Sequence, residues 1–456
     1  MSTAGGGESS SQAPPVQHIA LLAFPFGTLV AQLHMLARAL ASAVPEAIFS
    51  FVSNAENLVP LPHSSGGNLR LVPFQGGIEN GGCSTTLFDR IMAVAPEKIR
   101  AMLDLAEVNA GGVPVSCVMT DAFAWITESV SKENGLPWVA LHSGFSLAML
   151  AHIHAGDLRS RLGFASEGMP DRAQETLDFI PGLDSMRICD LPDGIISGDR
   201  NGEFSIHLQG MAQTLPGAAV VLLPSVPADF LEQDSGIFAD LNLALLIGPL
   251  NLLSPPPPSP DPEGCIQWLR DRPPLSVVYI SFGIVATLPP GELTELARGL
   301  EDSHVSFLWS LKAEQRSCLP AGFVERTQGR GKLVNWAPQV SVLGHPSVVV
   351  FVTHCGWNSA LESISAGVPM LCRPIFGDQR MVARALEEIW GVGAEFVGPI
   401  TRISFMIAME GIMTGIIGPK MREWTQELRQ RTMEAMFPGG GLFRNFNVLV
   451  NLIRGR

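Results

Sequence analysis

The sequence predicts an α/β protein of two domains, each built on a parallel β-sheet, that face each other across a cleft. Apolar runs of strand length alternate with helix-length segments through most of the chain. A proline-rich segment interrupts this alternation near the middle, and the same alternation then restarts. Strands that alternate with helices form parallel sheets covered on both faces. A length of 456 residues also favours more than one domain.

The chain opens, after an N-terminal tail, with a strand, a turn and a helix. Residues 16–24 are mostly apolar, Pro25 and Gly27 predict a turn, and residues 29–43 have the periodicity of a helix. A second strand at 47–53 completes a βαβ unit. Further buried strands are predicted at 114–123, 137–143 and 218–226.

Residues 255–262 contain six prolines, which favour an extended spacer. We therefore predict a linker over 251–264, between an N-terminal domain at 16–250 and a C-terminal domain at 265–440. The last segment, 441–456, contains an apolar stretch that predicts a helix packed back on the N-terminal domain. In the C-terminal domain we predict strand segments at 276–283, 305–312, 332–338 and 348–356, and a helix at 289–303.

The composition excludes several classes of protein. Hydrophobic residues make up 46% of the chain and charged residues 16%, which allows an extensive core and excludes general disorder. A net charge of −13 argues against binding to nucleic acid or to an anionic membrane surface. No apolar run approaches the roughly 18–20 residues that a membrane span needs.

Seven dispersed cysteines without a CxxC pair are typical of reduced thiols in a cytoplasmic protein, and predict neither disulfides nor a metal site. Residues 1–15 have no basic segment followed by an apolar one, so we interpret them as a flexible tail and not as a signal peptide.

The most informative segment is 336–379, WAPQVSVLGHPSVVVFVTHCGWNSALESISAGVPMLCRPIFGDQ. It contains a buried strand, a turn and a helix, for which Asn358 or Ser359 is a good N-cap. A helix that begins directly after a strand offers free amides to a phosphate. Glu362, one helical turn further, can accept the two hydroxyls of a ribose, and Trp336 can stack on a flat base. Asp378 and its neighbour can bind sugar hydroxyls.

Each of these residues alone has a commonplace structural explanation, and their joint order makes the pattern specific. The segment resembles the plant secondary-product glycosyltransferase box, the signature of family 1 UDP-sugar-dependent glycosyltransferases. That resemblance implies the GT-B fold, with two Rossmann-like domains. HIALLAFPFGT, PVSCVMTDAFAW, DFIPGL, CDLPDGI, GPLNLL, CIQWL and SVVYISFG are similar to the flavonoid and anthocyanidin 3-O-glucosyltransferase branch.

The resemblance implies a role for each residue of a UDP-glucose site, with no permanently bound cofactor and no metal. Trp336 would stack on uracil, and the backbone of Ala337 would hydrogen-bond the base. Gln339 and Glu362 would bind the ribose. The remaining donor residues would bind the diphosphate or the sugar; they are Thr28, Ser281, His354, Trp357, Asn358, Ser359, Asp378 and Gln379.

The chain departs from the family at its catalytic centre. Transfer to a hydroxyl needs a general base, which in the family is a histidine in the loop after the first strand, oriented by an aspartate. Asp121 matches the aspartate, but Leu29 occupies the position of the histidine. His142 is a candidate replacement, whereas His34 is better explained as a structural histidine. Ile284 stands where relatives usually have a threonine that meets the diphosphate.

Three functions remain open from the sequence. The first is a UDP-glucose-dependent glycosyltransferase that acts on a flavonoid or another phenolic plant metabolite without a histidine base. The second is a glycosyltransferase-fold enzyme recruited to a cyclisation or isomerisation, with Asp121 as acid or base. The third is a non-catalytic binder of a sugar nucleotide or flavonoid. For each we expect a cytoplasmic monomer, with an acceptor pocket around Phe123, His142, Phe145 and 189–195.

Overall fold

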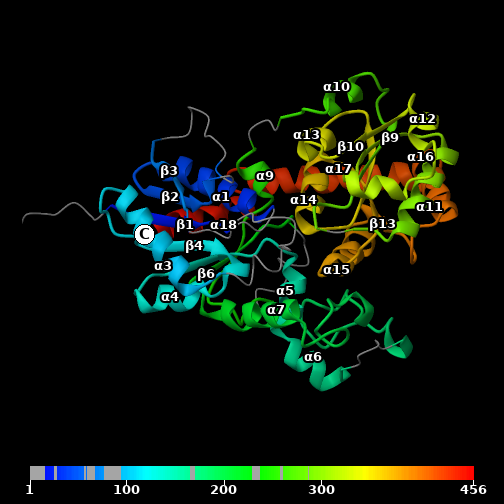
Figure 1. The fold of residues 1–456 in the computed structure, drawn as a ribbon. Helices are drawn as coiled ribbons and strands as arrows, with labels where there is room; N and C mark the ends of the chain where they lie inside the picture. The colour runs from blue at the N-terminus through cyan, green and yellow to red at the C-terminus, as the bar shows by residue number, and fades with distance from the viewer. Residues whose placement is uncertain are drawn as a thin grey trace, which may run out of the picture.

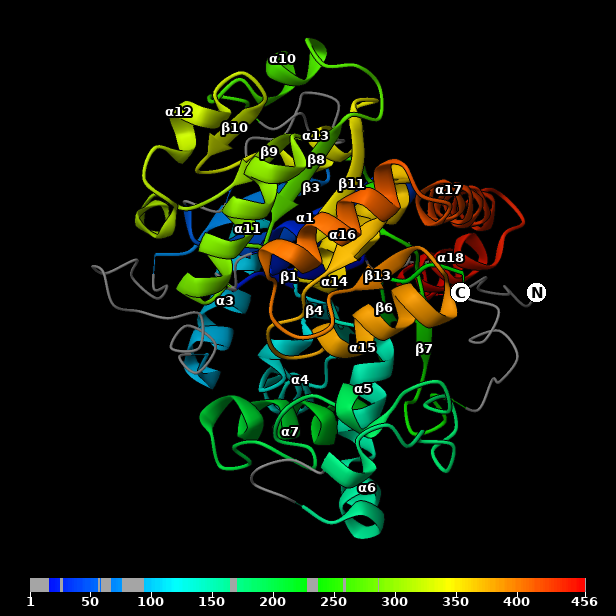
Figure 2. The same cartoon turned by 90° about the vertical axis from the view of Figure 1, so that its right-hand side faces the viewer.

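The computed structural model describes residues 16–24, 28–55, 58, 67–75, 94–164, 170–227, 237–256, 260–285 and 287–455. Two parallel sheets organise these residues, and Figures 1 and 2 show them side by side with helices on both faces of each. The predicted α/β fold with two parallel-sheet domains is therefore confirmed. The predicted N-terminal tail, 1–15, lies outside the described residues.

The N-terminal sheet has the strand order β3-β2-β1-β4-β5-β6-β7, and all of its pairings are parallel. Its strands are β1 (His18–Leu22), β2 (Ile48–Ser53), β3 (Leu69–Pro73), β4 (Cys117–Asp121), β5 (Trp138–Leu141), β6 (Val220–Leu223) and β7 (Ala244–Leu246). Its helices are α1 (Leu29–Ala43), α3 (Pro96–Asn109), α4 (Thr127–Glu133), α5 (Ser146–Ile153), α6 (Ala155–Leu162), α7 (Glu203–Thr214) and α9 (Leu250–Leu253).

The C-terminal sheet has the order β10-β9-β8-β11-β12-β13 and is also parallel throughout. Its strands are β8 (Val277–Ser281), β9 (Ser306–Ser310), β10 (Gly331–Val334), β11 (Val348–Thr353), β12 (Met370–Cys372) and β13 (Gly393–Glu395). The helices after the proline-rich segment are α10 (Cys265–Arg270), α11 (Pro290–Ser303), α12 (Phe323–Thr327), α13 (Gln339–Leu343), α14 (Trp357–Ala366), α15 (Gln379–Arg384), α16 (Arg402–Met413), α17 (Ile417–Met436) and α18 (Gly441–Ile453).

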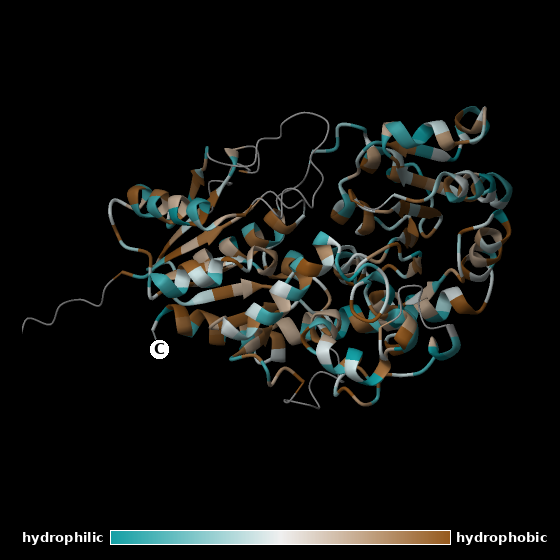
Figure 3. Ribbon diagram, turned by 60° about the horizontal axis from the view of Figure 1, so that its bottom comes forward, coloured by the Kyte–Doolittle hydropathy of each residue, from teal (hydrophilic) through white to brown (hydrophobic). Residues whose placement is uncertain are grey.

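Several strands of the N-terminal sheet are tan to brown in Figure 3, the colours of apolar residues. In β1, β8 and β11 every residue is buried, because helices cover both faces of a parallel sheet. This burial explains why uninterrupted apolar runs predicted these strands correctly. Strands of three residues, such as β7, β12 and β13, were not predicted, because so short a run has no distinguishable period.

The chain returns to its first domain at the C-terminus. Helix α17 follows the C-terminal domain, and α18 packs against the N-terminal sheet, near β1 and β4 in the view of Figure 1. Phe446, Leu449 and Val450 of α18 belong to the same buried cluster as β1 and β2. Asn445 also donates a hydrogen bond to the carbonyl of Leu246, at 3.0 Å.

One largely buried ion pair connects two elements of the C-terminal domain. The guanidinium of Arg373, just after β12, contacts both carboxylate oxygens of Glu292 in α11, at 2.8 and 2.7 Å. The backbone amide of Ile400 donates to the same carboxylate, at 2.8 Å.

We expect Glu292→Gln to lower the free energy of unfolding by about 3 kcal/mol, since removal of one partner leaves a buried charge uncompensated.

Chemical denaturation followed by circular dichroism would measure this loss. Glu175→Gln is the matched control, because Glu175 forms a similar pair with Arg172 in which both side chains are about half exposed. That substitution should leave the transition midpoint unchanged. Equal midpoints for both variants would show that the pair of Glu292 and Arg373 contributes no more than a surface pair.

Candidate active site

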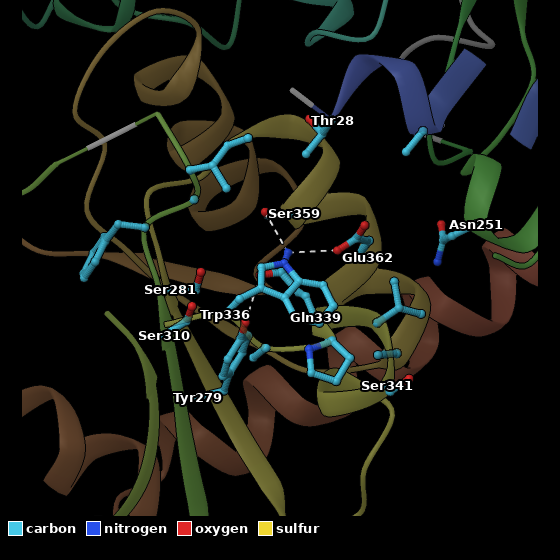
Figure 4. Close-up of a pocket in the computed structure, with 18 of the residues that line it drawn as sticks. Thr28, Asn251, Tyr279, Ser281, Ser310, Trp336, Gln339, Ser341, Ser359 and Glu362 are labelled. Atoms are coloured by element: carbon cyan, nitrogen blue, oxygen red, sulfur yellow. Dashed lines mark hydrogen bonds between the residues drawn. The ribbon is translucent and has the colours of Figure 1, made fainter. Parts of the chain in front are cut away.

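The carboxyl ends of both sheets face a large cavity of about 800 Å³. Thr28 and Asn251 reach it from the N-terminal domain, and the remaining labelled side chains in Figure 4 come from the C-terminal domain. This is the position at which open α/β sheets bind ligands. We call it the larger cavity.

A hydrogen-bonded group of side chains forms one wall of the larger cavity. Gln339 donates through Nε2 to the hydroxyl of Ser359 at 2.9 Å and to the carboxylate of Glu362 at 2.8 Å (Figure 4). The hydroxyl of Tyr279 donates to its Oε1 at 3.1 Å. Burial raises the pKa of Glu362, although the bond from Gln339 opposes this shift. The sequence analysis missed Tyr279, whose strand position gave no signal for a polar role.

Trp336 and Ala337 follow β10 and line the same cavity. The indole of Trp336 is 45% exposed, and Figure 4 shows it across the mouth of the cavity in front of Gln339. The carboxylate of Glu263 accepts from the backbone amides of Asn335 and Trp336, at 2.9 and 3.2 Å, and so fixes this turn. An exposed, well-held aromatic ring at a cavity mouth is suited to stacking on a planar ligand.

The turn between β11 and α14 is built around the imidazole of His354. Cys355 has a left-handed backbone, with φ of 65°. A Cβ atom on Gly283 or on Gly356 would lie 2.8 or 2.5 Å from Nε2 of His354, so both glycines are needed to make room for the ring. Burial lowers the pKa of His354 to about 4, and its Nδ1 has no hydrogen-bond partner among the described residues. The ring is therefore neutral at pH 7.

The helix after this turn begins earlier than predicted. Its N-cap is Gly356, and Trp357 is the first residue of α14, so the prediction of Asn358 or Ser359 as N-cap is wrong. With no side chain at the cap, the amides of the first turn have no capping acceptor. Asn358 instead donates to the hydroxyl of Thr28 across the cleft, at 3.4 Å.

A smaller cavity of about 270 Å³ adjoins the larger one. The two share a set of lining residues, so together they form one continuous site; the shared residues are Thr28, Gly283, Ile284, Gln339, Ser359 and Glu362. Leu29, Phe123 and His142 line the smaller cavity from the N-terminal domain. Phe145 and residues 189–195, which were expected around this pocket, are absent from its lining, and Phe145 packs on Trp357 instead, with ring centroids 4.8 Å apart.

Asp378 and Gln379 lie where the smaller cavity meets the C-terminal domain. The carboxylate of Asp378 accepts from the backbone amide of Phe145 at 2.9 Å, which ties the two domains together. Oε1 of Gln379 accepts from the amides of Ile375 and Phe376, at 2.8 and 3.1 Å. These bonds fix the orientation of both side chains at the start of α15.

Ile284, the second residue at which the chain departs from its family, lies at the junction between the two cavities. Its side chain is exposed, and its carbonyl accepts from Nζ of Lys312 at 2.8 Å. Lys312 also lines the larger cavity and brings a positive charge to it, together with the buried hydroxyl of Ser281. The sequence analysis missed Lys312, because a lysine at a strand end is usually solvated.

Asp121 is buried at the end of β4. Its Oδ2 accepts from the hydroxyl of Ser143 at 2.6 Å, and its Oδ1 accepts from the amide of Phe123 at 2.9 Å. Burial raises the pKa of Asp121 to about 6, while both hydrogen bonds oppose the shift. The carboxyl is therefore poised to exchange a proton near neutral pH.

Neither candidate histidine contacts Asp121 through a hydrogen bond in the described part of the chain. His142 lines the smaller cavity, and burial lowers its pKa to about 4. His34 packs on Phe51, with ring centroids 5.0 Å apart, and lines neither cavity. This position agrees with the structural interpretation of His34.

Within the residues that the structure describes, no group of three or more His, Cys, Asp or Glu side chains has the arrangement of a metal site. The same residues include no helix long and apolar enough to span a membrane.

Comparison with known proteins assigns the family. The sequence model of the UDP-glucoronosyl and UDP-glucosyl transferase family matches residues 259–419. The chain is 42% identical to a myricetin 3-O-rhamnosyltransferase of Crocosmia x crocosmiiflora, and the match covers 96% of this chain and 98% of that protein. The chain belongs to this family. An anthocyanidin 3-O-glucosyltransferase of Vitis vinifera is 39% identical over 97% of the chain and 98% of its own length.

Among solved structures, a UDP-glucose:anthocyanidin 3-O-glucosyltransferase in complex with UDP superposes with a TM-score of 0.86 and 33% identity. The match covers 96% of this chain and 99% of that one. The protein therefore has the GT-B fold of plant family 1 glycosyltransferases, as the resemblance implied.

The raised pKa of Asp121 predicts a pH-dependent effect on stability. The folded protein binds the proton at a higher pH than the unfolded chain does, so the charged carboxylate destabilises the fold above pH 6. We expect Asp121→Asn to raise the free energy of unfolding at pH 7.5 by about 1–3 kcal/mol, because the amide carries no charge. Thermal unfolding at several pH values measures this gain.

The gain should shrink as the pH falls from 7 towards 4, since the parent protein then becomes protonated itself. Asp104→Asn, in the exposed part of α3, serves as a control with the same chemical change. A stabilisation that is independent of pH would contradict a raised pKa at Asp121.

Proposed function

We propose that the protein transfers glucose from UDP-glucose to a hydroxyl of a flavonoid or a related phenol, at a centre without the histidine base of its family. The observation that carries this proposal is the pair of adjoining cavities. The larger cavity offers an exposed aromatic ring and a half-buried carboxylate, whereas the smaller one presents the N-terminus of α14 together with apolar side chains such as Leu29, Phe123 and Met149. A nucleotide sugar has the chemistry that complements the larger cavity, and an aromatic acceptor has the chemistry that complements the apolar side chains of the smaller one.

In the larger cavity, uracil would stack on Trp336 and meet the backbone of Ala337. The ribose hydroxyls would bind Gln339 and Glu362, whose existing hydrogen bond already places them side by side. The bond from Gln339 to Glu362 would open or be shared when the ribose arrives. A partly desolvated carboxylate such as that of Glu362 gains from these donors, because they replace the hydration that it lost.

The diphosphate would lie at the first turn of α14. Free amides and the positive end of the helix dipole favour an anion there. Neutral His354 can donate one N–H, and the polar side chains around it supply further donors without adding charge. The donor side chains that we propose for this position are Thr28, Ser281, His354, Asn358 and Ser359. Lys312 adds a cation nearby.

Glucose would lie between the two cavities, where Trp357, Asp378 and Gln379 meet the N-terminal domain. The carboxylate of Asp378 is an acceptor for sugar hydroxyls, and the amide of Gln379 is a donor. Ile284 at this junction forfeits the hydrogen bond that a threonine would give, which is worth roughly 1.5–3 kcal/mol when it involves a charged group.

A second candidate function rests on Leu29. Without a histidine at that position, the buried Asp121 could act as acid or base on a bound phenolic compound in a cyclisation or isomerisation, with no sugar transferred. This candidate requires no nucleotide affinity, which separates it from the first.

We propose that the protein works as a monomer in the cytoplasm. In the described part of the chain, Cys117, Cys189, Cys265, Cys318, Cys355 and Cys372 are all free thiols. Reduced cysteines are typical of that compartment.

Calorimetric titration with UDP-glucose, followed by assay of UDP release with a flavonol, tests the proposed function. We expect binding in the micromolar range, together with turnover and a glucosylated product identified by mass spectrometry. Binding without turnover would favour a non-catalytic binder. Absence of binding would sink the transferase proposal and favour the second candidate.

Trp336→Ala tests the proposed base platform. Loss of one aromatic stacking partner costs about 1–3 kcal/mol, so we expect the Kd for UDP to rise by about 5- to 150-fold. Trp424→Ala is the matched control, because the indole of Trp424 is 46% exposed, nearly the same as that of Trp336, but lies away from the larger cavity. An equal affinity in both variants would remove Trp336 from the nucleotide site.

A further inference from the structure

Sheet register brings Ser143 to Asp121. Strands β4 and β5 are parallel neighbours, and Asp121 at the end of β4 pairs with Leu141 at the end of β5. Ser143 follows two residues later, so its side chain leaves the same edge of the sheet as the carboxylate. The amide of His142 donates to the carbonyl of Leu222 at 2.9 Å, which keeps the start of this loop in the extension of β5.

The hydroxyl of Ser143 stands between Asp121 and the smaller cavity. It donates to Oδ2 of Asp121 at 2.6 Å, a short distance that is typical of a bond to a carboxylate. Ser143 lines the cavity together with Leu29, whereas Asp121 is not part of that lining. The carboxylate of Asp121 is therefore connected to the smaller cavity through the hydroxyl of Ser143, to which it is already hydrogen-bonded.

We propose that Ser143 and Asp121 form a proton relay that replaces the missing histidine base. This inference rests on the proposed transferase function and assigns Ser143 as the group that contacts the acceptor hydroxyl. A serine hydroxyl can accept one hydrogen bond while it donates another, so its free lone pair is available to the acceptor.

The relay conserves protons and charge. As the acceptor oxygen attacks the anomeric carbon, the bond from that carbon to the β-phosphate oxygen breaks and UDP leaves with the electron pair. The acceptor proton passes to Oγ of Ser143, and the serine proton passes to Oδ2 of Asp121 in the same step. After the product has left, Ser143 releases the proton from the acceptor to solvent and takes back the proton from Asp121, which restores the starting state.

Proton affinities favour Asp121 over the nearby histidine as the final acceptor. Burial raises the pKa of Asp121 to about 6 but lowers that of His142 to about 4. The carboxylate is thus the stronger base, and it remains ionised for the most part at pH 7.

Ser143→Ala tests the relay in the full chain. We expect kcat with a flavonol to fall by about 10²–10³-fold, within the range for loss of general-base catalysis, with an unchanged Kd for UDP-glucose. Ser143→Thr keeps the hydroxyl and should retain most of the activity. Ser146→Ala is the control, because Ser146 is also buried, lines neither cavity, and has no partner for its Oγ among the described residues.

Leu29→His separates a catalytic role from a structural one. Placed in the Ser143→Ala protein, it should restore transfer by at least about tenfold, since a second base then lines the same cavity. Three results would overturn the relay: an undiminished kcat in Ser143→Ala, a loss matched by weaker UDP-glucose binding, or no recovery with Leu29→His.

The wild-type protein distinguishes the failure of this inference from that of the proposed function. No transfer by the wild type would overturn both. Transfer by the wild type that persists in Ser143→Ala would overturn the relay alone and leave the transferase proposal intact.

Discussion

The packing of Trp357 across the cleft is the contact on which the arrangement of the site depends most directly. The indole N–H of Trp357, the first residue of α14, donates to the carbonyl of Pro224 after β6, at 2.8 Å. The same indole packs on Phe145 from the N-terminal domain and on Trp390 from its own, with ring centroids 4.8 and 6.1 Å apart. Because Trp357 also begins the helix that faces both cavities, the same side chain links the contact between the domains to the position of the helix N-terminus.

The residues of the proposed nucleotide side could be predicted from the sequence because they are local in the chain. Strand β11, the turn at His354 and helix α14 form one continuous βα unit, so their polar residues occur at a recognisable spacing. The position of the cap was wrong, since propensity favours a polar side chain there and the fold needs Gly356 beside the His354 ring. The close approach of the His354 ring therefore requires glycine at the N-cap, although a polar side chain would be the better cap on local grounds.

The residues of the proposed acceptor side were far less predictable. Its residues come from separate strands and helices of the first domain, and only the sheet order brings them together. Asp121 was found through its family motif, but its partner Ser143 carries no signal in the sequence, because the pair depends on the register of β4 against β5. Phe145 looked like a pocket residue and is an interdomain packing residue.

The environment of Asp121 supports a functional role for its carboxylate in the folded protein. An aspartate whose pKa is raised by burial lowers the stability of the fold at neutral pH, and an asparagine of the same shape would avoid that cost. Groups with such perturbed pKa values gather at functional sites, where their proton affinity is used. Leu29 removes one base from this centre, yet the sheet still delivers a buried carboxylate to its edge and connects it to the cavity through a hydroxyl. Leu29 and Asp121 are compatible in one centre, because the proposed proton path does not involve Leu29 and runs through Ser143.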